Sequence, residues 1–104
     1  MNLNELTREI VSVNVSNGWT LYNGAPWGDR MAIASALALI HSEVSEALEA
    51  VRKNDRDNFL EELADTLIRV LDLAASQTED FEKVVADKLA VNRTRGYRHG
   101  GKKL

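Results

Sequence analysis

The stretch "HSEVSEALEAVRKNDRDNFLEELADTLIRVLD" (His41–Asp72) contains two copies of a short acidic pattern, separated by a polar break. Glu43 and Glu46 form the first pair, and Glu62 and Asp65 form the second. On a helix, residues at positions i and i+3 project side by side, so each pair brings two like charges together. Two such pairs indicate either ordinary solvated helix faces or a cation bound between them.

The helix that carries the first pair has two apolar strips. We expect the main strip to form the core, and its members are Ile33, Leu37, Ile40, Val44, Ala47, Leu48 and Val51. Glu43 lies at the edge of this strip, and Glu46 falls within a shallower strip formed by Ala32, Ala36, Leu39 and Ala50. Carboxylates on apolar surface lose hydration and repel each other, and a bound cation would offset both effects.

The helix that carries the second pair is less informative on its own. Its predicted core residues are Leu60, Leu63, Leu67, Val70, Leu71 and Ala74. Glu62, Asp65, Arg69 and Asp72 share the opposite side, for which a solvated face is the favoured interpretation. The cation hypothesis therefore depends on both pairs, because antiparallel packing across the short turn can bring them into register.

The remaining sequence predicts helices and no strands. Apolar spacing predicts a helix over residues 3–16, and Asp29 is the expected N-cap of a second helix that runs to about Lys53. A third helix is expected from about Asp57 to Ser76, and Thr78 is expected to cap a fourth that ends near Asn92. Four amphipathic helices predict an all-α, antiparallel four-helix bundle. Their wide apolar faces predict completion by oligomerisation, as a dimer or tetramer.

Composition and charge narrow the class of protein. The 104 residues predict one domain over residues 1–92, followed by a basic, flexible tail over residues 93–104. The chain contains no cysteine, which excludes disulfides and thiolate metal sites. We find no signal peptide and no apolar run long enough for a membrane span, so a soluble cytoplasmic protein is expected.

The four carboxylates offer only oxygen ligands. Such ligands select hard cations, Mg²⁺ or alternatively Mn²⁺, over zinc or copper. A di-iron bundle would carry Glu-x-x-His, whereas neither His41 nor His99 stands three residues after a glutamate. His41 is interpreted as a surface or supporting residue.

Several motifs together resemble a known family. These are E43-x-x-E46, fifteen intervening residues and E62-x-x-D65, with "GWT", "LIHSEVSEALEAVR", "EELADTLIRVLDLA" and "NRTRGYRHGGKK" around them. This pattern resembles the MazG-like nucleotide pyrophosphohydrolases, which are the all-α NTP pyrophosphatase superfamily, and in particular their short single-domain members. The likeness covers most of the chain.

The resemblance implies Mg²⁺-dependent hydrolysis of a nucleoside triphosphate between its α and β phosphates. It implies that Glu43, Glu46, Glu62 and Asp65 bind the metal and that one of them activates water. Residues that could contact the substrate are Trp19, Arg69, Lys88, Asn92 and Arg95. Each also has an ordinary structural role: Trp19 can plug the bundle end, Arg69 can pair with Asp65 or Asp72, and a basic helix end complements the helix dipole.

Two other functions fit the sequence. A non-catalytic helical module could bind nucleic acid or a partner protein through its basic tail, although the acidic body disfavours nucleic acid. Alternatively, a degenerate family member could keep the fold without the chemistry, which the presence of all four acidic residues argues against.

Overall fold

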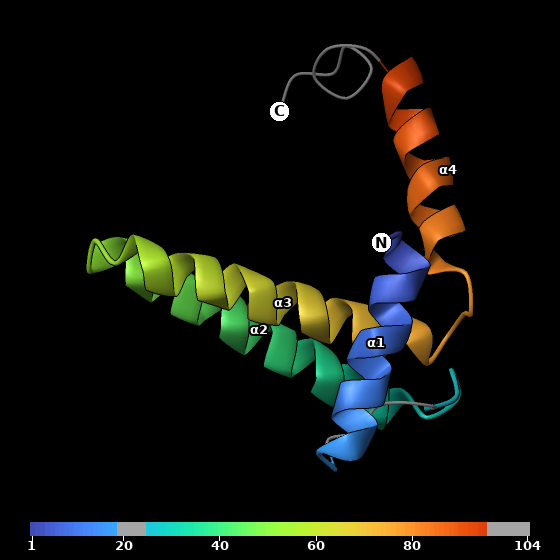
Figure 1. The fold of residues 1–104 in the computed structure, drawn as a ribbon, viewed down its shortest axis with the longest axis horizontal. Coiled ribbons are helices and arrows are strands. Elements are labelled where there is room, and N and C mark those ends of the chain that lie inside the picture. Colours follow the sequence, from blue (N-terminus) through green and yellow to red (C-terminus); the bar gives the residue numbers. More distant parts are fainter. Residues whose placement is uncertain (19–24, 96–104) are drawn as a thin grey trace.

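The computed structural model describes residues 1–18 and 25–95 of the chain, which fold into four helices (Figure 1). No strand occurs among these residues, so the predicted all-α class is confirmed. The predicted tail begins inside the last helix, and its residues 96–104 lie outside the described ranges. The helices are α1 (Leu3–Ser16), α2 (Arg30–Arg52), α3 (Arg56–Ala75) and α4 (Phe81–Thr94).

An aspartate caps the N-terminus of each of the three later helices. Asp29 accepts a hydrogen bond from the Ala32 N–H, as predicted, and Asp55 accepts one from Asn58. The expected cap of α4 is wrong, because Asp80 rather than Thr78 accepts from the Lys83 N–H. The Thr78 Oγ1 instead accepts from the Asp80 N–H at 3.1 Å, and this bond orders the turn that precedes the helix.

A tight turn joins α2 to α3. Asn54 adopts a left-handed conformation (φ 55°), which asparagine tolerates better than most residues. The Asp55 N–H then bonds back to the Ala50 carbonyl at 2.9 Å, so the end of α2 is closed. This turn reverses the chain and lays α3 antiparallel beside α2, as Figure 1 shows.

The two helices meet along a strip of small residues. This alanine strip consists of Ala36, Ala47 and Ala50, which are 5%, 5% and 1% exposed. Small side chains allow two helix backbones to approach closely, and this brings the polar groups beside the strip within reach of each other. Two of these three alanines belong to the strip that the sequence analysis considered the shallower one.

The main apolar strip does not form the core of one chain. Because α2 turns its alanines toward α3, its larger side chains point roughly 100° away from that contact. Leu48 is 52% exposed and Leu63 on α3 is 46% exposed. In the single chain the expected burial therefore holds for Ala47, is partial for Ile33 and Ile40, and is wrong for the larger exposed members Leu37, Val44, Leu48 and Val51. The half-exposed face, which we call the Leu/Val face, consists of Leu37, Val44, Leu48 and Val51 of α2 with Leu60, Leu63 and Leu67 of α3.

Helices α1 and α4 join the hairpin at the end of α3 that is farthest from the α2–α3 turn (Figure 1). The Leu3 N–H donates to Glu82 Oε1 at 2.9 Å, and the Glu82 N–H donates to Asn4 Oδ1 at 3.1 Å, so the first turns of α1 and α4 cap each other. Beyond this junction α4 projects away from the hairpin and has no buried residue. The four helices thus do not close around one core within a single chain.

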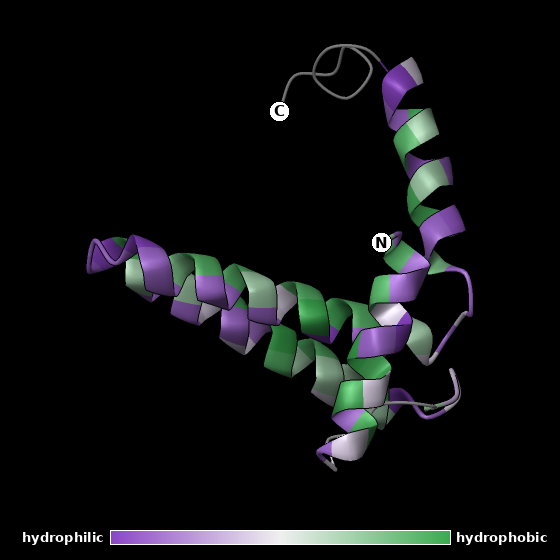
Figure 2. Cartoon of the chain, viewed as in Figure 1, coloured by the Kyte–Doolittle hydropathy of each residue, from purple (hydrophilic) through white to green (hydrophobic). Residues whose placement is uncertain are grey.

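Helix α2 is long and apolar enough to cross a membrane by length and composition, with a mean hydropathy of 1.3 in its most apolar window. This differs from the expectation above that no apolar run is long enough for a membrane span. Figure 2 shows apolar segments along both α2 and α3, and several of their large apolar side chains are half exposed. Glu43 and Glu46 interrupt the same helix, and acidic side chains are costly inside a bilayer.

Candidate metal centre

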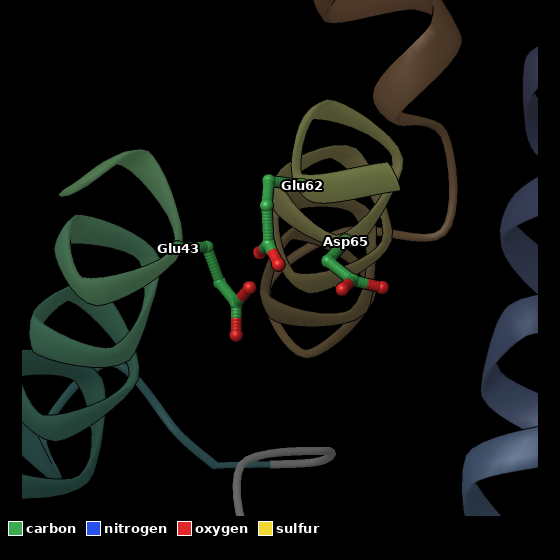
Figure 3. A group of neighbouring side chains, drawn as sticks. All are labelled: Glu43, Glu62 and Asp65. Atoms are coloured by element: carbon green, nitrogen blue, oxygen red, sulfur yellow. The ribbon is translucent and has the colours of Figure 1, made fainter. Parts of the chain in front are cut away.

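Three carboxylates from two helices come together on one side of the α2–α3 pair. Glu43 extends from α2, and Glu62 and Asp65 extend from α3 (Figure 3). One carboxylate oxygen from each of the three lies within 4.8 Å of the others. We call this group the carboxylate cluster. Its formation depends on the alanine strip, because Ala47 stands one turn after Glu43 on the side of α2 that meets α3.

Glu46 lies beside this cluster. It is exposed, and it is close enough to Glu62 for its carboxylate to raise the pKa of Glu62. The structure therefore brings Glu43, Glu62 and Asp65 together and leaves Glu46 at the solvent edge, next to Glu62. All four acidic residues singled out in the sequence lie in one region of the molecule.

Glu62 is the most strongly perturbed member of the group. A hydrogen bond with the Glu43 carboxyl, burial, and the neighbouring Glu46 raise the pKa of Glu62 to about 7. Its Oε2 atom is buried and has no hydrogen-bond partner among the residues that the structure describes. An unpaired buried oxygen destabilises the fold, and a cation bound at this position would satisfy it and reduce the repulsion. This oxygen-only set fits a hard divalent cation such as Mg²⁺ or Mn²⁺.

Arg69 supplies a positive charge at the edge of the cluster. Its Nε donates a hydrogen bond to Glu43 Oε1 at 3.1 Å, and the Glu43 side chain is only 13% exposed. The helical spacing predicts Asp65 or Asp72 as the ion-pair partner of Arg69, whereas the structure pairs it with Glu43. The contact crosses from α3 to α2, so only the packing of the two helices reveals it.

Asp72 is buried, which contradicts the interpretation of this side of α3 as solvated. Asp72 is 7% exposed, and within residues 1–18 and 25–95 its Oδ1 has no hydrogen-bond partner. Burial raises the pKa of Asp72, while Asn14 of α1 and the Arg69 charge act in the opposite direction. Helix α1 covers this end of α3, which explains the burial. The spacing of Glu62, Asp65, Arg69 and Asp72 along one face was the available signal, but the packing of α1 was not predictable from it.

The other residues suggested as substrate contacts do not join the cluster. Lys88, Asn92 and Arg95 are exposed along the second half of α4 or just beyond it, which points away from the α2–α3 pair (Figure 1). Trp19 lies outside the described residues. His41 is exposed on α2, as expected.

Comparison with known proteins gives one match. Residues 32–95, more than half of the chain, match the model of a family described as the MazG nucleotide pyrophosphohydrolase domain. The matched segment includes both acidic pairs and almost all of α2, with α3 and α4 in full. No curated protein and no solved structure matches the chain.

Proposed function

The chain belongs to the MazG nucleotide pyrophosphohydrolase family, and from that membership we propose that it hydrolyses a nucleoside triphosphate to the monophosphate and pyrophosphate. The bond that breaks joins the α and β phosphates. The observation that carries this proposal is the convergence of carboxylate oxygens from three residues on two helices within 4.8 Å of one another, one residue having a buried oxygen without a hydrogen-bond partner in the described part of the chain.

Glu43, Glu46, Glu62 and Asp65 would hold the metal, which we propose to be Mg²⁺, with Mn²⁺ as a substitute. When bound, such an ion neutralises phosphate oxygens and makes a coordinated water more acidic. Without it, an acidic cluster repels a polyanionic triphosphate. The pKa of Glu62, about 7 without metal, shows how strongly these carboxylates disfavour sharing one region as anions.

Residues of the chain would also activate water and contact the substrate in this proposal. One carboxylate of the four orients or deprotonates the attacking water. The Arg69 guanidinium, now paired with Glu43, has the charge and position to contact a substrate phosphate beside the cluster. Stacking of Trp19 on the base, and phosphate or base contacts from Lys88, Asn92 and Arg95, remain part of the proposal.

We further propose that the protein acts as a homo-oligomer in the cytoplasm and that neither membrane nor nucleic acid is its target. Lys88 and Asn92 lie on α4 and Arg95 follows it, and α4 projects away from the α2–α3 pair of the same chain (Figure 1). A contribution of these residues to catalysis would therefore come from α4 of a neighbouring copy.

The test is pyrophosphate release from a panel of ribo- and deoxynucleoside triphosphates, with and without Mg²⁺. We expect metal-dependent release with at least one triphosphate, and a loss of at least about a hundredfold for Glu62→Gln. Glu61→Gln is the matched control, because Glu61 is exposed and lies outside the cluster. Helical circular dichroism should not change in either variant. A fully active Glu62→Gln variant would refute the metal assignment, and nucleic-acid retardation in a gel without turnover would favour a binding module.

A further inference from the structure

Asp72 is a buried ionisable residue that the catalytic proposal does not use. It is 7% exposed, and its Oδ1 accepts no hydrogen bond from the residues that the structure describes. A buried carboxylate oxygen without a partner destabilises a fold, because the oxygen has left water without gaining another donor. Such an oxygen needs an explanation, and a donor that reaches it in another state of the protein is one.

The position of Asp72 on α3 places it in line with the carboxylate cluster. At about 100° per residue, Glu62, Asp65, Arg69 and Asp72 fall within about 80° of one another around α3. Asp72 lies about 10 Å beyond Asp65 along the helix axis, and Arg69 stands between them. Arg69 is therefore the residue of this row that has a carboxylate on either side.

The Arg69 guanidinium acts on carboxylates of both helices. Its Nε donates to Glu43 Oε1 at 3.1 Å. Burial raises the pKa of Asp72, and Asn14 and the Arg69 charge lower it, so the guanidinium lies near enough to Asp72 to act on its charge. A guanidinium has five N–H donors, and the contact with Glu43 uses one of them. The Arg69 side chain is 42% exposed, so its outer part can change rotamer without unpacking α2 from α3.

A cation in the carboxylate cluster would weaken the contact between Arg69 and Glu43. Glu43 offers an oxygen to the cluster, and its Oε1 accepts from Arg69. A divalent ion beside the guanidinium repels it and neutralises the Glu43 charge on which the ion pair depends. Asp72 is the next carboxylate on the same face of α3, at the i,i+3 spacing at which helical side chains meet.

We propose that Asp72 is a positioning residue, which receives the Arg69 guanidinium when a divalent cation occupies the carboxylate cluster. This role rests on the proposed metal site. In the metal-free chain Arg69 neutralises Glu43, and in the metal-bound chain it donates to Asp72 Oδ1 and stays beside the cluster. Its other N–H donors are then available to a substrate phosphate, whereas Asp72 touches neither metal nor substrate.

A purely structural role is the competing explanation for Asp72. Asn14 of α1 lies close enough to the Asp72 carboxyl to lower its pKa, so Asp72 would simply hold α1 against α3. Such a role leaves Oδ1 without a donor in every state of the protein. It also predicts that loss of the Asp72 charge has the same effect whether or not Arg69 is present. The two explanations therefore differ in the coupling between Asp72 and Arg69.

The first test is a double-mutant cycle in which titration calorimetry measures Mn²⁺ binding at pH 8, without nucleotide. We expect Asp72→Asn to weaken binding about tenfold, because the guanidinium then stays at Glu43 and repels the ion. In an Arg69→Gln background, the same change should weaken binding by less than about twofold. Glu61→Gln removes one negative charge from an exposed position of α3 and should weaken binding by less than about threefold.

A second measurement follows the Arg69 side chain by nuclear magnetic resonance. Its Nε–H signal is identified by its absence from the spectrum of Arg69→Gln. We expect the wild type to show this signal both without metal and with saturating Mg²⁺, at two different chemical shifts. In Asp72→Asn the signal should persist without metal and disappear through exchange with solvent when Mg²⁺ is added. Glu61→Gln should behave as the wild type does.

Two results would overturn the proposal and leave the metal site intact. One is an equal effect of Asp72→Asn on Mn²⁺ binding in both backgrounds, and the other is loss of the wild-type Arg69 signal when Mg²⁺ is added. The second result needs no Asp72 variant, so it decides the question even if Asp72→Asn fails to fold. A wild type that binds no Mn²⁺ would instead refute the metal assignment, and this proposal with it.

Discussion

Glu62 has a buried carboxylate oxygen and two carboxylate neighbours, Glu43 and Glu46. We therefore expect the stability of the folded chain to depend on pH. The pKa of Glu62, about 7 in the folded chain, lies above the ordinary value of 4.5. Between these two values the folded state holds a proton that the unfolded state releases, so stability decreases as pH rises through this window. Below pH 4.5 both states are protonated and the effect disappears.

We therefore predict that, without metal, Glu62→Gln unfolds at a higher temperature than the wild type at pH 8 and that this advantage vanishes near pH 4.5. Thermal unfolding followed by circular dichroism at a series of pH values measures the difference. The exposed Glu61→Gln should show no such trend. A wild type that gains stability relative to Glu62→Gln as pH rises would contradict the assignment of the raised pKa.

The residues of the site were predictable from the sequence to different degrees. Spacing singled out Glu43, Glu46, Glu62 and Asp65, because i,i+3 geometry is a local property of a helix, and the structure brings three of them, Glu43, Glu62 and Asp65, together. The ion pair between Arg69 and Glu43 depends on how two helices meet, and the burial of Asp72 depends on α1. Neither contact is encoded in the periodicity of one helix, so sequence reasoning missed both.

At the scale of helices, the alanine strip sets the distance between the two acidic pairs. Ala47 is 5% exposed where α2 meets α3. We predict that Ala47→Ile forces the helices apart, weakens Mn²⁺ binding about tenfold, and destabilises the fold by about 1–3 kcal/mol, which is the usual range for overpacking. Titration calorimetry with Mn²⁺ and chemical unfolding measure the two effects.

Ala38→Ile is the matched control for this prediction, because Ala38 is an exposed residue of the same helix. It introduces the same β-branched side chain without changing the helix contact. Should Ala47→Ile bind Mn²⁺ as tightly as Ala38→Ile does, the helix spacing would not control the site.

Helix boundaries were predicted closely, but the choice of packing face was not. Capping by Asp29 and the turn at Asn54 depend on hydrogen bonds between residues close in the sequence, so the residue types alone predict them. On α2, however, two apolar strips competed, and the larger side chains suggested the wrong one. The alanines face α3 inside the chain, and Leu37, Val44, Leu48 and Val51 remain half exposed. Periodicity identifies apolar strips but does not assign each to its partner.

At the scale of the whole molecule, folding and self-association should be linked. If a second copy covers the Leu/Val face, binding stabilises only the folded chain, so the melting temperature rises with protein concentration. We predict an increase of a few degrees in Tm over a hundredfold range of wild-type concentration and none for Leu48→Glu. Differential scanning calorimetry at several concentrations measures it, and a concentration-independent wild-type Tm would argue against coupled folding and association.

The hairpin is only one helix thick, with acids on one side and Leu and Val on the other. If two hairpins pack against each other through their Leu/Val faces, the two carboxylate clusters lie on opposite outer sides of the pair. A single small ligand could then not contact both carboxylate clusters at the same time. Bulk added at the alanine strip would change the spacing of α2 and α3, and with it both the carboxylate cluster on one side and the Leu/Val face on the other.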